Sequence, residues 1–345
     1  MPPRPNAAAP MVSPVEVANQ WMSRGGREAF SPLFGQPCLV VDLSNEIALP
    51  ETLAACWTAG LRELACPSIA WCPGPGGRDR HRASGFDVVA SDGAELEAIV
   101  ETCVAQPLAS LALVQLLRRT EESSIHAGLE SESLVYSMLQ AGPGFSNWLS
   151  ARDPESLHRP EARPGSPLRV ERSGAVLELV LDRPEKRNAF SAQLRDALAE
   201  ALDVVLADSG ISEVRWRAEG PAFCAGGDLD EFGTLPDPAT AHAIRSTRNV
   251  ARLVAACAER LRVEVQGACV GAGVELPAFA ARVVARHDAF FALPEVAMGL
   301  VPGAGGTVSL PRRIGRQRTA WMALTGAKVD AKTALQWRLV DELSD

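Results

Sequence analysis

The chain has 345 residues, 47% of them hydrophobic and 22% charged, with a formal net charge of −8. A chain of this length can bury one large core or two ordinary ones, so the composition predicts a folded globular protein. The acidic balance excludes a protein that wraps nucleic acid or lies on an anionic membrane, because both require an excess of lysine and arginine. A pocket for a small polyanion is still compatible with this charge.

The cysteines and the first residues predict a cytoplasmic protein. Eight cysteines are spread along the chain, without a Cys-x-x-Cys pair and without histidines at the spacing of metal ligands. We therefore expect buried thiols in a reducing compartment and no metal site. The opening MPPRPNAAAP lacks the features of a signal peptide, and no stretch of about 18 apolar residues occurs.

Proline-rich segments divide the chain into two parts. Residues 1–12 are rich in proline and alanine and are predicted to be disordered. The segment SLHRPEARPGSPL at 156–168 is typical of a linker. These boundaries predict an N-terminal region over 13–155 and a second domain over 169–345. Within the first region, the Gly-, Pro- and Arg-rich stretch 72–85 breaks any periodicity.

The N-terminal region begins as α/β and continues as helices. CLVVDL at 38–43 and PSIAWC at 67–72 are typical of buried strands, and the stretch from Pro50 to Leu64 favours a helix. From Ala94 onward, apolar residues recur at helical spacing, which predicts three amphipathic helices. Their apolar positions are Leu96, Ile99, Val100, Cys103 and Val104, then Leu108, Leu111, Val114 and Leu117, then Leu129, Val135 and Met138.

The second part alternates strand and helix. Leu177, Leu179 and Leu181 share one face of a predicted strand. Ser191 is predicted to cap the helix that follows, and a further strand is expected at 214–217. This order predicts an α/β fold.

Two glycine-rich turns come next, and each is expected to enter a helix. In PAFCAGGDLDEF at 221–232, two glycines precede Asp228, a favourable helix N-cap. In GACVGAGVELPAFAA at 267–281, small residues let the backbone approach a ligand closely. Two outward-pointing amides can stabilise the charge that develops on a thioester carbonyl when an enolate forms. Taken alone, each turn is weak evidence for a site, because most glycine-rich turns have a purely conformational role.

Two glutamates interrupt sequence that is otherwise apolar. Glu275 lies near the start of a predicted apolar helix, and Glu295 follows Pro294 after the run AFFAL. Burying an uncompensated carboxylate is costly. Both residues are therefore candidates for acid/base chemistry, or else structural acids whose oxygens accept hydrogen bonds from backbone amides.

Four segments resemble the enoyl-CoA hydratase/isomerase, or crotonase, family in their order and spacing. They are LDRPEKRNAFS at 181–191, AFCAGGDL at 222–229, GACVGAGVEL at 267–276 and ALPEVAMGLVPGAGGTVSLPRRIG at 292–315. The resemblance covers about residues 170–345. It implies a crotonase-type ββα spiral core, here with an additional N-terminal α/β and helical region. It also implies an enzyme that binds an acyl-CoA thioester and needs no cofactor besides the coenzyme A of its substrate.

The resemblance assigns roles to named residues. The amides of Gly227 and Ala272 are implied to form an oxyanion hole, although the family more often has glycine at the second position. Glu275 is implied to activate water, and Glu295 to exchange a proton with the α-carbon. Coenzyme A and the acyl group are implied to be held by Arg183, Lys186, Arg187, Phe223, Ala225, Gly226, Asp228, Gly271 and Gly303. The three basic residues among these equally fit solvated surface charges.

The pair of glutamates favours hydration of a 2-enoyl-CoA, or the reverse dehydration of a 3-hydroxyacyl-CoA. Isomerases of the family generally work with only the later glutamate. The alternatives are a double-bond isomerase and a non-catalytic acyl-CoA-binding protein that kept the fold. The sequence indicates neither the acyl group nor the direction, and it does not distinguish coenzyme A from a carrier protein with the same pantetheine arm.

Three further residues within the resembling segments receive expectations. Thr307 is expected to cap a helix. Cys224 and Cys269 lie inside the two glycine turns but have no histidine near them in sequence, so we expect buried thiols rather than nucleophiles.

The resemblance breaks at the end of the chain. Family members continue beyond the segment LTGAKVDAKTALQWRLVDEL with a helical region that completes the site and packs subunits into trimers. Residues 107–152 resemble that region, yet they precede the catalytic part. We therefore expect either a permuted arrangement, in which 94–152 supply the absent helices in cis or to a neighbouring subunit, or a degenerate tandem copy. A homotrimer or hexamer is implied.

Overall fold

The computed structural model describes residues 10–22, 26, 28–44, 51–74, 83–152, 165–234 and 237–345, with the side chains of 22 and 51–56 left out of the description. Most of the predicted disordered N-terminus, of the linker and of the stretch 72–85 lies outside these residues. Met11 and Val12, which we expected to be disordered, form a short strand instead. The predicted disorder is therefore wrong at its C-terminal end.

The N-terminal region contains a four-stranded parallel sheet in the order β1-β2-β3-β4. Parallel neighbours need crossover connections, and α1 and α2 supply two of them. The two predicted buried strands and the predicted helix are confirmed as β2, β3 and α2. The elements are β1 (Met11–Val12), α1 (Pro14–Met22), β2 (Leu39–Asp42), α2 (Glu51–Arg62), β3 (Ser68–Trp71) and β4 (Val88–Ala90).

Four helices follow this sheet, and the three predicted ones are among them. They are α3 (Gly93–Ala105), α4 (Pro107–Thr120), α5 (Ile125–Gln140) and α6 (Pro143–Ser150). The predicted apolar faces are wrong at Val104, Leu108 and Met138, which are 45%, 45% and 58% exposed. The chain bends by 110° between α3 and α4. Helical spacing alone does not reveal that Val104 and Leu108, on either side of this bend, turn toward solvent.

Within the described part of the chain, no single helix is long and apolar enough to cross a membrane. Only α3 and α4 taken together, as a bent pair, meet the requirement of length and composition.

The second part is built from two sheets joined by a spiral path of the chain. The larger sheet has the order β13-β10-β8-β7-β6-β5 and is parallel except between β5 and β6, and the smaller has the order β12-β11-β9. Consecutive strands β8 and β9 enter different sheets, as do β10 and β11, which is the ββα repeat that the resemblance implied. The strands are β5 (Leu168–Ser173), β6 (Val176–Leu181), β7 (Glu213–Ala218), β8 (Leu261–Val265), β9 (Ala268–Val270), β10 (Arg282–Arg286), β11 (Phe290–Ala292), β12 (Val329–Asp330) and β13 (Glu342–Ser344).

The helices of the second part confirm some predictions and correct others. Ser191 caps α7 by accepting a hydrogen bond from the Leu194 amide at 3.2 Å, as expected. Asp228, by contrast, caps only the three-residue 3-10 helix η5, and Glu275 is the last rather than the first residue of the single-turn helix α10. The helices are α7 (Ala192–Ala207), η5 (Leu229–Glu231), α8 (Pro238–Thr247), α9 (Val250–Ala256), α10 (Ala272–Glu275), η8 (Glu295–Met298), α11 (Gly306–Ile314), α12 (Arg316–Thr325) and α13 (Ala331–Trp337).

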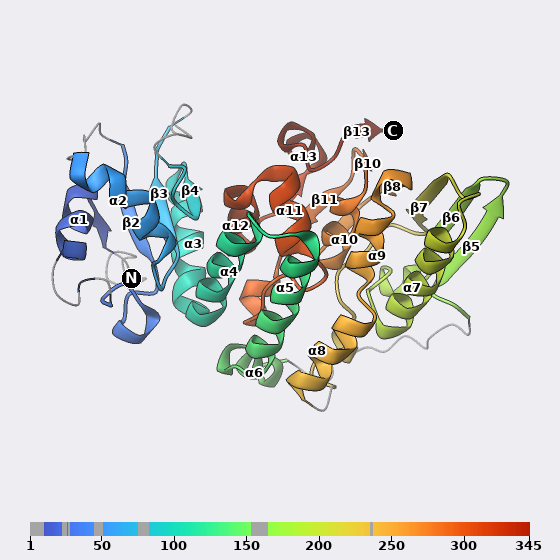
Figure 1. Cartoon of the computed structure of the whole chain (residues 1–345), viewed down its shortest axis with the longest axis horizontal. Coiled ribbons are helices and arrows are strands. Elements are labelled where there is room, and N and C mark those ends of the chain that lie inside the picture. Colours follow the sequence, from blue (N-terminus) through green and yellow to red (C-terminus); the bar gives the residue numbers. More distant parts are fainter. Residues whose placement is uncertain are drawn as a thin grey trace.

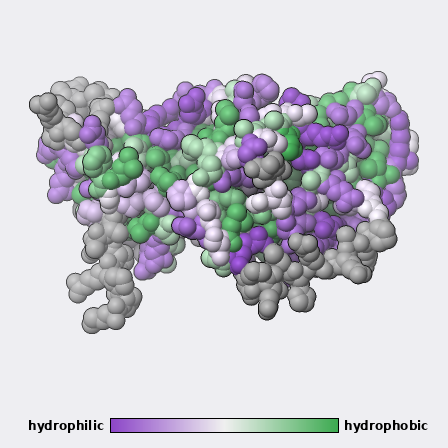
Figure 2. Space-filling model, turned by 90° about the horizontal axis from the view of Figure 1, so that it is seen from below, coloured by the Kyte–Doolittle hydropathy of each residue, from purple (hydrophilic) through white to green (hydrophobic). Residues whose placement is uncertain are grey.

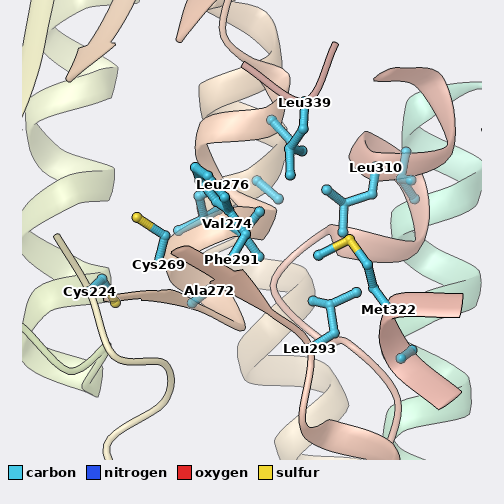
Figure 3. Packing of buried hydrophobic residues seen from close by; sticks show 14 of the residues in the cluster. Cys224, Cys269, Ala272, Val274, Leu276, Phe291, Leu293, Leu310, Met322 and Leu339 are labelled. Carbon is cyan, nitrogen blue, oxygen red and sulfur yellow. The ribbon is translucent and has the colours of Figure 1, made fainter. Parts of the chain in front are cut away.

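Helices of the N-terminal region pack directly on the second part. α3 contacts α12, α4 contacts α11 and α12, and α5 contacts α8, α9 and α11. Figure 1 shows α3 to α6 between the N-terminal sheet and the larger sheet. One buried apolar cluster includes Leu113 and Leu129 from this region together with Leu310 and Met322, which face each other from α11 and α12 in Figure 3. The two parts therefore share a core.

A buried ionic junction ties the N-terminal sheet to α4 and α12. Asp87, which directly precedes β4, accepts hydrogen bonds from Arg118 Nη2 at 2.6 Å and Arg118 Nε at 2.9 Å. Arg316 Nη1 lies 3.3 Å from the same carboxylate. The backbone amide and hydroxyl of Ser68 complete the shell at 2.9 and 2.8 Å. The charges of Asp87 and its two arginines are therefore paired away from water.

We expect Asp87→Ala to destabilise the protein by about 3–5 kcal/mol, because it leaves Arg118 buried without its counterion and leaves Arg316 with only the partly exposed Glu121. Urea denaturation of both proteins measures this difference. Glu122→Ala is the matched control, since it breaks the exposed ion pair between Arg62 and a glutamate whose side chain is 72% exposed. We expect less than about 1 kcal/mol for that change. Equal effects of the two substitutions would contradict the importance of the junction.

Candidate active site

A cavity of about 230 Å³ lies between α5 of the N-terminal region and the glycine turns of the second part. Six of the predicted site residues line it: Gly227, Asp228, Ala272, Glu275, Glu295 and Gly303. The remaining predicted residues stand outside its described lining. The fold therefore brings the predicted glutamate pair and the predicted pair of amides into one space, although they come from separate turns.

The amides of Gly227 and Ala272 donate to no acceptor among the described residues. The adjacent amides, by contrast, have acceptors: Asp228 N donates to Phe190 O, and Gly271 N donates to a carbonyl of β11, both at 3.0 Å. Ala272 begins α10, where the first amides of a helix have no partner within the helix. Because backbone amides inside a protein are normally paired, two unpaired amides at one cavity are candidates for donors to an anionic oxygen.

Glu275 and Glu295 converge on Gly271. Glu275 is 2% exposed, and its Oε2 accepts hydrogen bonds from the amides of Ala304 at 2.7 Å and Gly306 at 2.8 Å. The Oε2 atom of Glu295 is buried and has no hydrogen-bond partner among the described residues. A Cβ atom at Gly271, whose φ is 51°, would collide with Oε1 of Glu295 and lie 3.7 Å from Oε1 of Glu275. Glycine at this position therefore leaves the space between the two carboxylates open.

Burial sets the protonation of this pair. Loss of solvent raises the pKa of Glu295 to about 8. Loss of solvent, and then the charge of Glu295, raise the pKa of Glu275 well above its ordinary value. Two carboxylates that interact in this way titrate as a pair, so near neutral pH they hold a proton between them. One group can then accept a proton while the other donates one.

A third carboxylate, which the sequence analysis missed, holds the same glycine turn from the other side. Glu132 on α5 is 3% exposed and accepts hydrogen bonds from Gly305 N at 2.7 Å, Thr307 N at 3.0 Å and Thr307 Oγ1 at 2.6 Å. Burial raises the pKa of Glu132 to about 7. The expectation that Thr307 caps a helix is wrong: Gly305 is the cap of α11, and the threonine hydroxyl serves Glu132 instead.

Successive amides of this turn therefore point in opposite directions. The amides of residues 304 and 306 bind Glu275, and those of 305 and 307 bind Glu132. The N-terminal region thereby fixes the turn that positions Glu275.

Two of the basic residues assigned to coenzyme A are already paired with carboxylates. Arg183 Nη1 lies 3.0 Å from Asp228 Oδ2. Lys186 forms a short ion pair with Asp230, and its ammonium group lies 3.9 Å from Asp228 Oδ1. Arg187 is exposed and adopts a left-handed backbone conformation with φ of 49°. Arg183 and Lys186 are therefore not solvated surface charges in this structure. They are also not free to bind a phosphate, because carboxylates already pair with them.

The residues of the turn at 223–226 are held by side-chain packing and backbone hydrogen bonds. Phe223 is 1% exposed and packs on Trp216 with ring centroids 5.7 Å apart. Ala225 N donates to Arg187 O at 3.0 Å, and the carbonyl of Gly226, whose φ is 98°, accepts from Phe190 at 2.7 Å. These bonds fix the path of the chain as it enters the cavity at residue 227.

Cys224 and Cys269 are buried thiols, as expected. They are 3% and 0% exposed and lie beside Ala272 in the apolar packing of Figure 3. Burial raises the pKa of Cys224 to about 12 and also raises that of Cys269, so neither forms a thiolate at neutral pH. The seven described cysteines are all buried and free of disulfides.

Comparisons with known proteins place the second part in a family. The sequence model described as Enoyl-CoA hydratase/isomerase matches residues 171–344. The 2,3-dehydroadipyl-CoA hydratase of Escherichia coli (strain K12) is 37% identical over 178 residues, which cover 52% of this chain and 69% of the relative. Enoyl-CoA isomerase/hydratase fer4 of Mycosarcoma maydis is 34% identical over 178 residues, 49% of this chain and 65% of the relative.

A solved enoyl-CoA hydratase from Thermoplasma volcanium GSS1 is 31% identical, with 52% of this chain and 73% of that chain covered and a TM-score of 0.48. The chain thus spans about two thirds of the length of the curated relatives that it matches. The family match coincides with the part that contributes both unpaired amides and both converging carboxylates of the cavity. The chain belongs to the enoyl-CoA hydratase/isomerase family.

Proposed function

We propose that the protein adds water to the double bond of a 2-enoyl-CoA, or catalyses the reverse dehydration of a 3-hydroxyacyl-CoA. The observation that carries the proposal is the convergence of two buried carboxylates, Glu275 and Glu295, on the open space at Gly271. Two amides without acceptors face the same cavity. Hydration needs a base for the water, an acid for the α-carbon and donors for the enolate oxygen, and these groups can supply all three.

In the proposed reaction, the thioester oxygen accepts hydrogen bonds from the amides of Gly227 and Ala272. Glu275 takes one proton from a water molecule as the water oxygen bonds to the β-carbon. The electrons of the double bond move toward the thioester oxygen and form an enolate. Protonated Glu295 then gives its proton to the α-carbon, so one water molecule is added in total. Each amide donor lowers the barrier by about 3 kcal/mol.

We propose that segment 183–190 and the turn at 223–226 form the walls for the adenine and pantetheine of coenzyme A. Arg187 is the basic residue of this segment that is exposed, so it is the most available to a phosphate group. We propose no cofactor besides the coenzyme A of the substrate.

We also propose that α4 to α6 take the place of the helical region that family members carry after the catalytic part. Their packing on α11 and the hydrogen bonds of Glu132 support this assignment. A cytoplasmic homotrimer or hexamer is our proposal for the assembly. Leu134 and Met138 on α5 are 53% and 58% exposed, and Figure 2 shows hydrophobic patches between hydrophilic ones on the face seen from below. Measuring the mass in solution tests the assembly.

One observation favours double-bond isomerisation as a second candidate. Oε2 of Glu275 is held by two amides, whereas Oε2 of Glu295 has no partner among the described residues. Glu295 alone could therefore move a proton from the α-carbon of a 3-enoyl-CoA to its γ-carbon.

The two reactions change the ultraviolet absorbance of the conjugated enoyl thioester in opposite directions. We expect the protein to bleach this band with crotonyl-CoA and longer 2-enoyl-CoA esters, because hydration removes the conjugated double bond. An isomerase would instead create the band from a 3-enoyl-CoA and leave crotonyl-CoA unchanged. Binding of these esters in calorimetry without any change in absorbance would contradict both catalytic functions and favour a non-catalytic acyl-CoA-binding protein.

A further inference from the structure

The side of the cavity formed by α5 and α8 carries two donor groups without an acceptor among the described residues, the hydroxyl of Tyr136 and Nη1 of Arg245. Tyr136 on α5 and Arg245 on α8 both line the cavity. Tyr136 is the single tyrosine of the sequence, and its hydroxyl forms no hydrogen bond within the described part of the chain. Its ring packs over the backbone of Gly303, where a Cβ atom would collide with it. This donor therefore lies next to the turn that binds Glu275.

Neutral groups alone hold the guanidinium group of Arg245. Its Nε donates to Ser133 Oγ at 3.2 Å, and its Nη2 donates to Ser137 Oγ and to Gln140 Oε1, the latter at 3.3 Å. The guanidinium carbon lies 4.8 Å from the centre of the Tyr136 ring. These contacts fix the plane of the group, while Nη1 has no acceptor among the described residues.

The other two arginines that line the cavity each have a carboxylate nearby. Arg195 lies 2.8 Å from Asp196, and Arg248 lies 3.6 Å from the same aspartate. Glu132 is the carboxylate of α5 nearest in sequence to the residues that hold Arg245, but its oxygens are occupied by the glycine turn. Within the described residues, Arg245 is therefore the cavity arginine without a carboxylate at ion-pair distance.

A half-buried cation without a counterion is costly. Burial lowers the pKa of Arg245 from its ordinary value, which reflects the loss of solvent around the charge. An anion that accepted hydrogen bonds from the free Nη1 and from a neighbouring hydroxyl would offset this cost, and a planar carboxylate matches the planar guanidinium group.

We propose that Tyr136 and Arg245 bind a carboxylate at the far end of the acyl group, so that the protein prefers CoA esters of short dicarboxylic acids. This inference rests on the proposed function, which assigns the thioester oxygen of the substrate to the amides of Gly227 and Ala272. An ester that ends in a methyl group leaves Nη1 of Arg245 and the hydroxyl of Tyr136 without an acceptor. Sites that are built to bind a polar group discriminate strongly against analogues that lack it.

The test compares kcat/KM for 2-hexenedioyl-CoA and 2-hexenoyl-CoA, which differ only in the terminal carboxylate. We expect the wild-type protein to prefer the diacid ester by about 100-fold, and Arg245→Gln to remove most of this ratio. Tyr136→Phe, which removes one donor, should reduce the ratio by about tenfold. Arg248→Gln is the matched control, because it changes a cavity arginine that already has carboxylate partners, and the ratio should persist. Thermal unfolding checks that each variant is folded.

Three results would overturn the inference. The first is an equal kcat/KM of the wild-type protein for both esters. The second is an equal loss with both esters in Arg245→Gln, which would assign the arginine to the shared CoA moiety or to the fold. The third is a kcat/KM for 6-hydroxy-2-hexenoyl-CoA that equals the value for the diacid ester, because the site would then bind any terminal oxygen rather than a carboxylate.

The saturated esters adipyl-CoA and hexanoyl-CoA separate this inference from the proposed function, because they bind without reacting. Absence of turnover on every enoyl ester would overturn the proposed function alone. In that case, tighter calorimetric binding of adipyl-CoA that is lost in Arg245→Gln would still support the carboxylate site. Equal binding of the two saturated esters would overturn it.

Discussion

Replacing Glu295 by glutamine is expected to lower kcat for hydration of crotonyl-CoA by about 10³-fold, because general acid catalysis of this kind contributes 10²–10⁴-fold. Glu275→Gln should lower it by a similar factor, since the water would lose its base. Both carboxylates face the space at Gly271, and glutamine keeps the size of the side chain. Binding of butyryl-CoA, measured by calorimetry, should change little.

Glu231→Gln is the control for these variants, since this glutamate lines the same cavity without facing Gly271. We expect it to change kcat by less than about threefold. Wild-type turnover in Glu295→Gln would remove this residue from the chemistry. If Glu275→Gln abolished hydration but kept isomerisation of a 3-enoyl-CoA, the two glutamates would have separate roles.

The pH dependence of hydration follows from the raised pKa values. In the hydration direction Glu295 must be protonated, and burial raises its pKa to about 8. We therefore expect kcat/KM to fall as the pH rises through about 8, and to fall again at low pH, where the partner carboxylate that must accept a proton becomes protonated. The alkaline limb should disappear from the residual activity of Glu295→Gln.

A chain consisting of residues 156–345 alone is expected to be insoluble or inactive. Removing the N-terminal region uncovers the faces of α11 and α12 on which α3, α4 and α5 pack. It also leaves the amides of Gly305 and Thr307 without their acceptor, at a cost of about 1–3 kcal/mol for each buried group. Solubility and turnover of this fragment, compared with the full chain, measure the effect. A soluble and fully active fragment would refute the view that the N-terminal region completes the site.

A single substitution also tests whether the N-terminal region completes the site. Glu132→Ala should destabilise the full chain by about 3 kcal/mol and lower kcat, because the turn that positions Glu275 loses its support. Glu132→Gln keeps an acceptor oxygen and should recover part of both losses. Glu130→Ala, on the exposed face of the same helix, is the control and should be close to neutral. An unchanged kcat in a stably folded Glu132→Ala would limit this residue to a structural role.

The sequence by itself determined the parts of this protein that depend on local geometry. Strands β2, β3 and β6, the cap of α7 and the two glycine turns all follow from the backbone preferences of neighbouring residues. The roles of the glutamates and amides were instead implied by the family resemblance of the segments that contain them. Their order along the chain was sufficient to indicate the family.

The tertiary structure decided the contacts that join distant elements. Glu132 lies 143 positions before Glu275 in the sequence, and its role depends on how α5 packs on α11. Its place at helical spacing between Leu129 and Tyr136 was a signal, because a carboxylate on a buried helix face requires partners. The pairing of Arg183 with Asp228, and the absence of a carboxylate partner for Arg245 among the described residues, also depend on packing. Long-range ion pairs form only where the fold brings two charges together, and no local pattern encodes that distance.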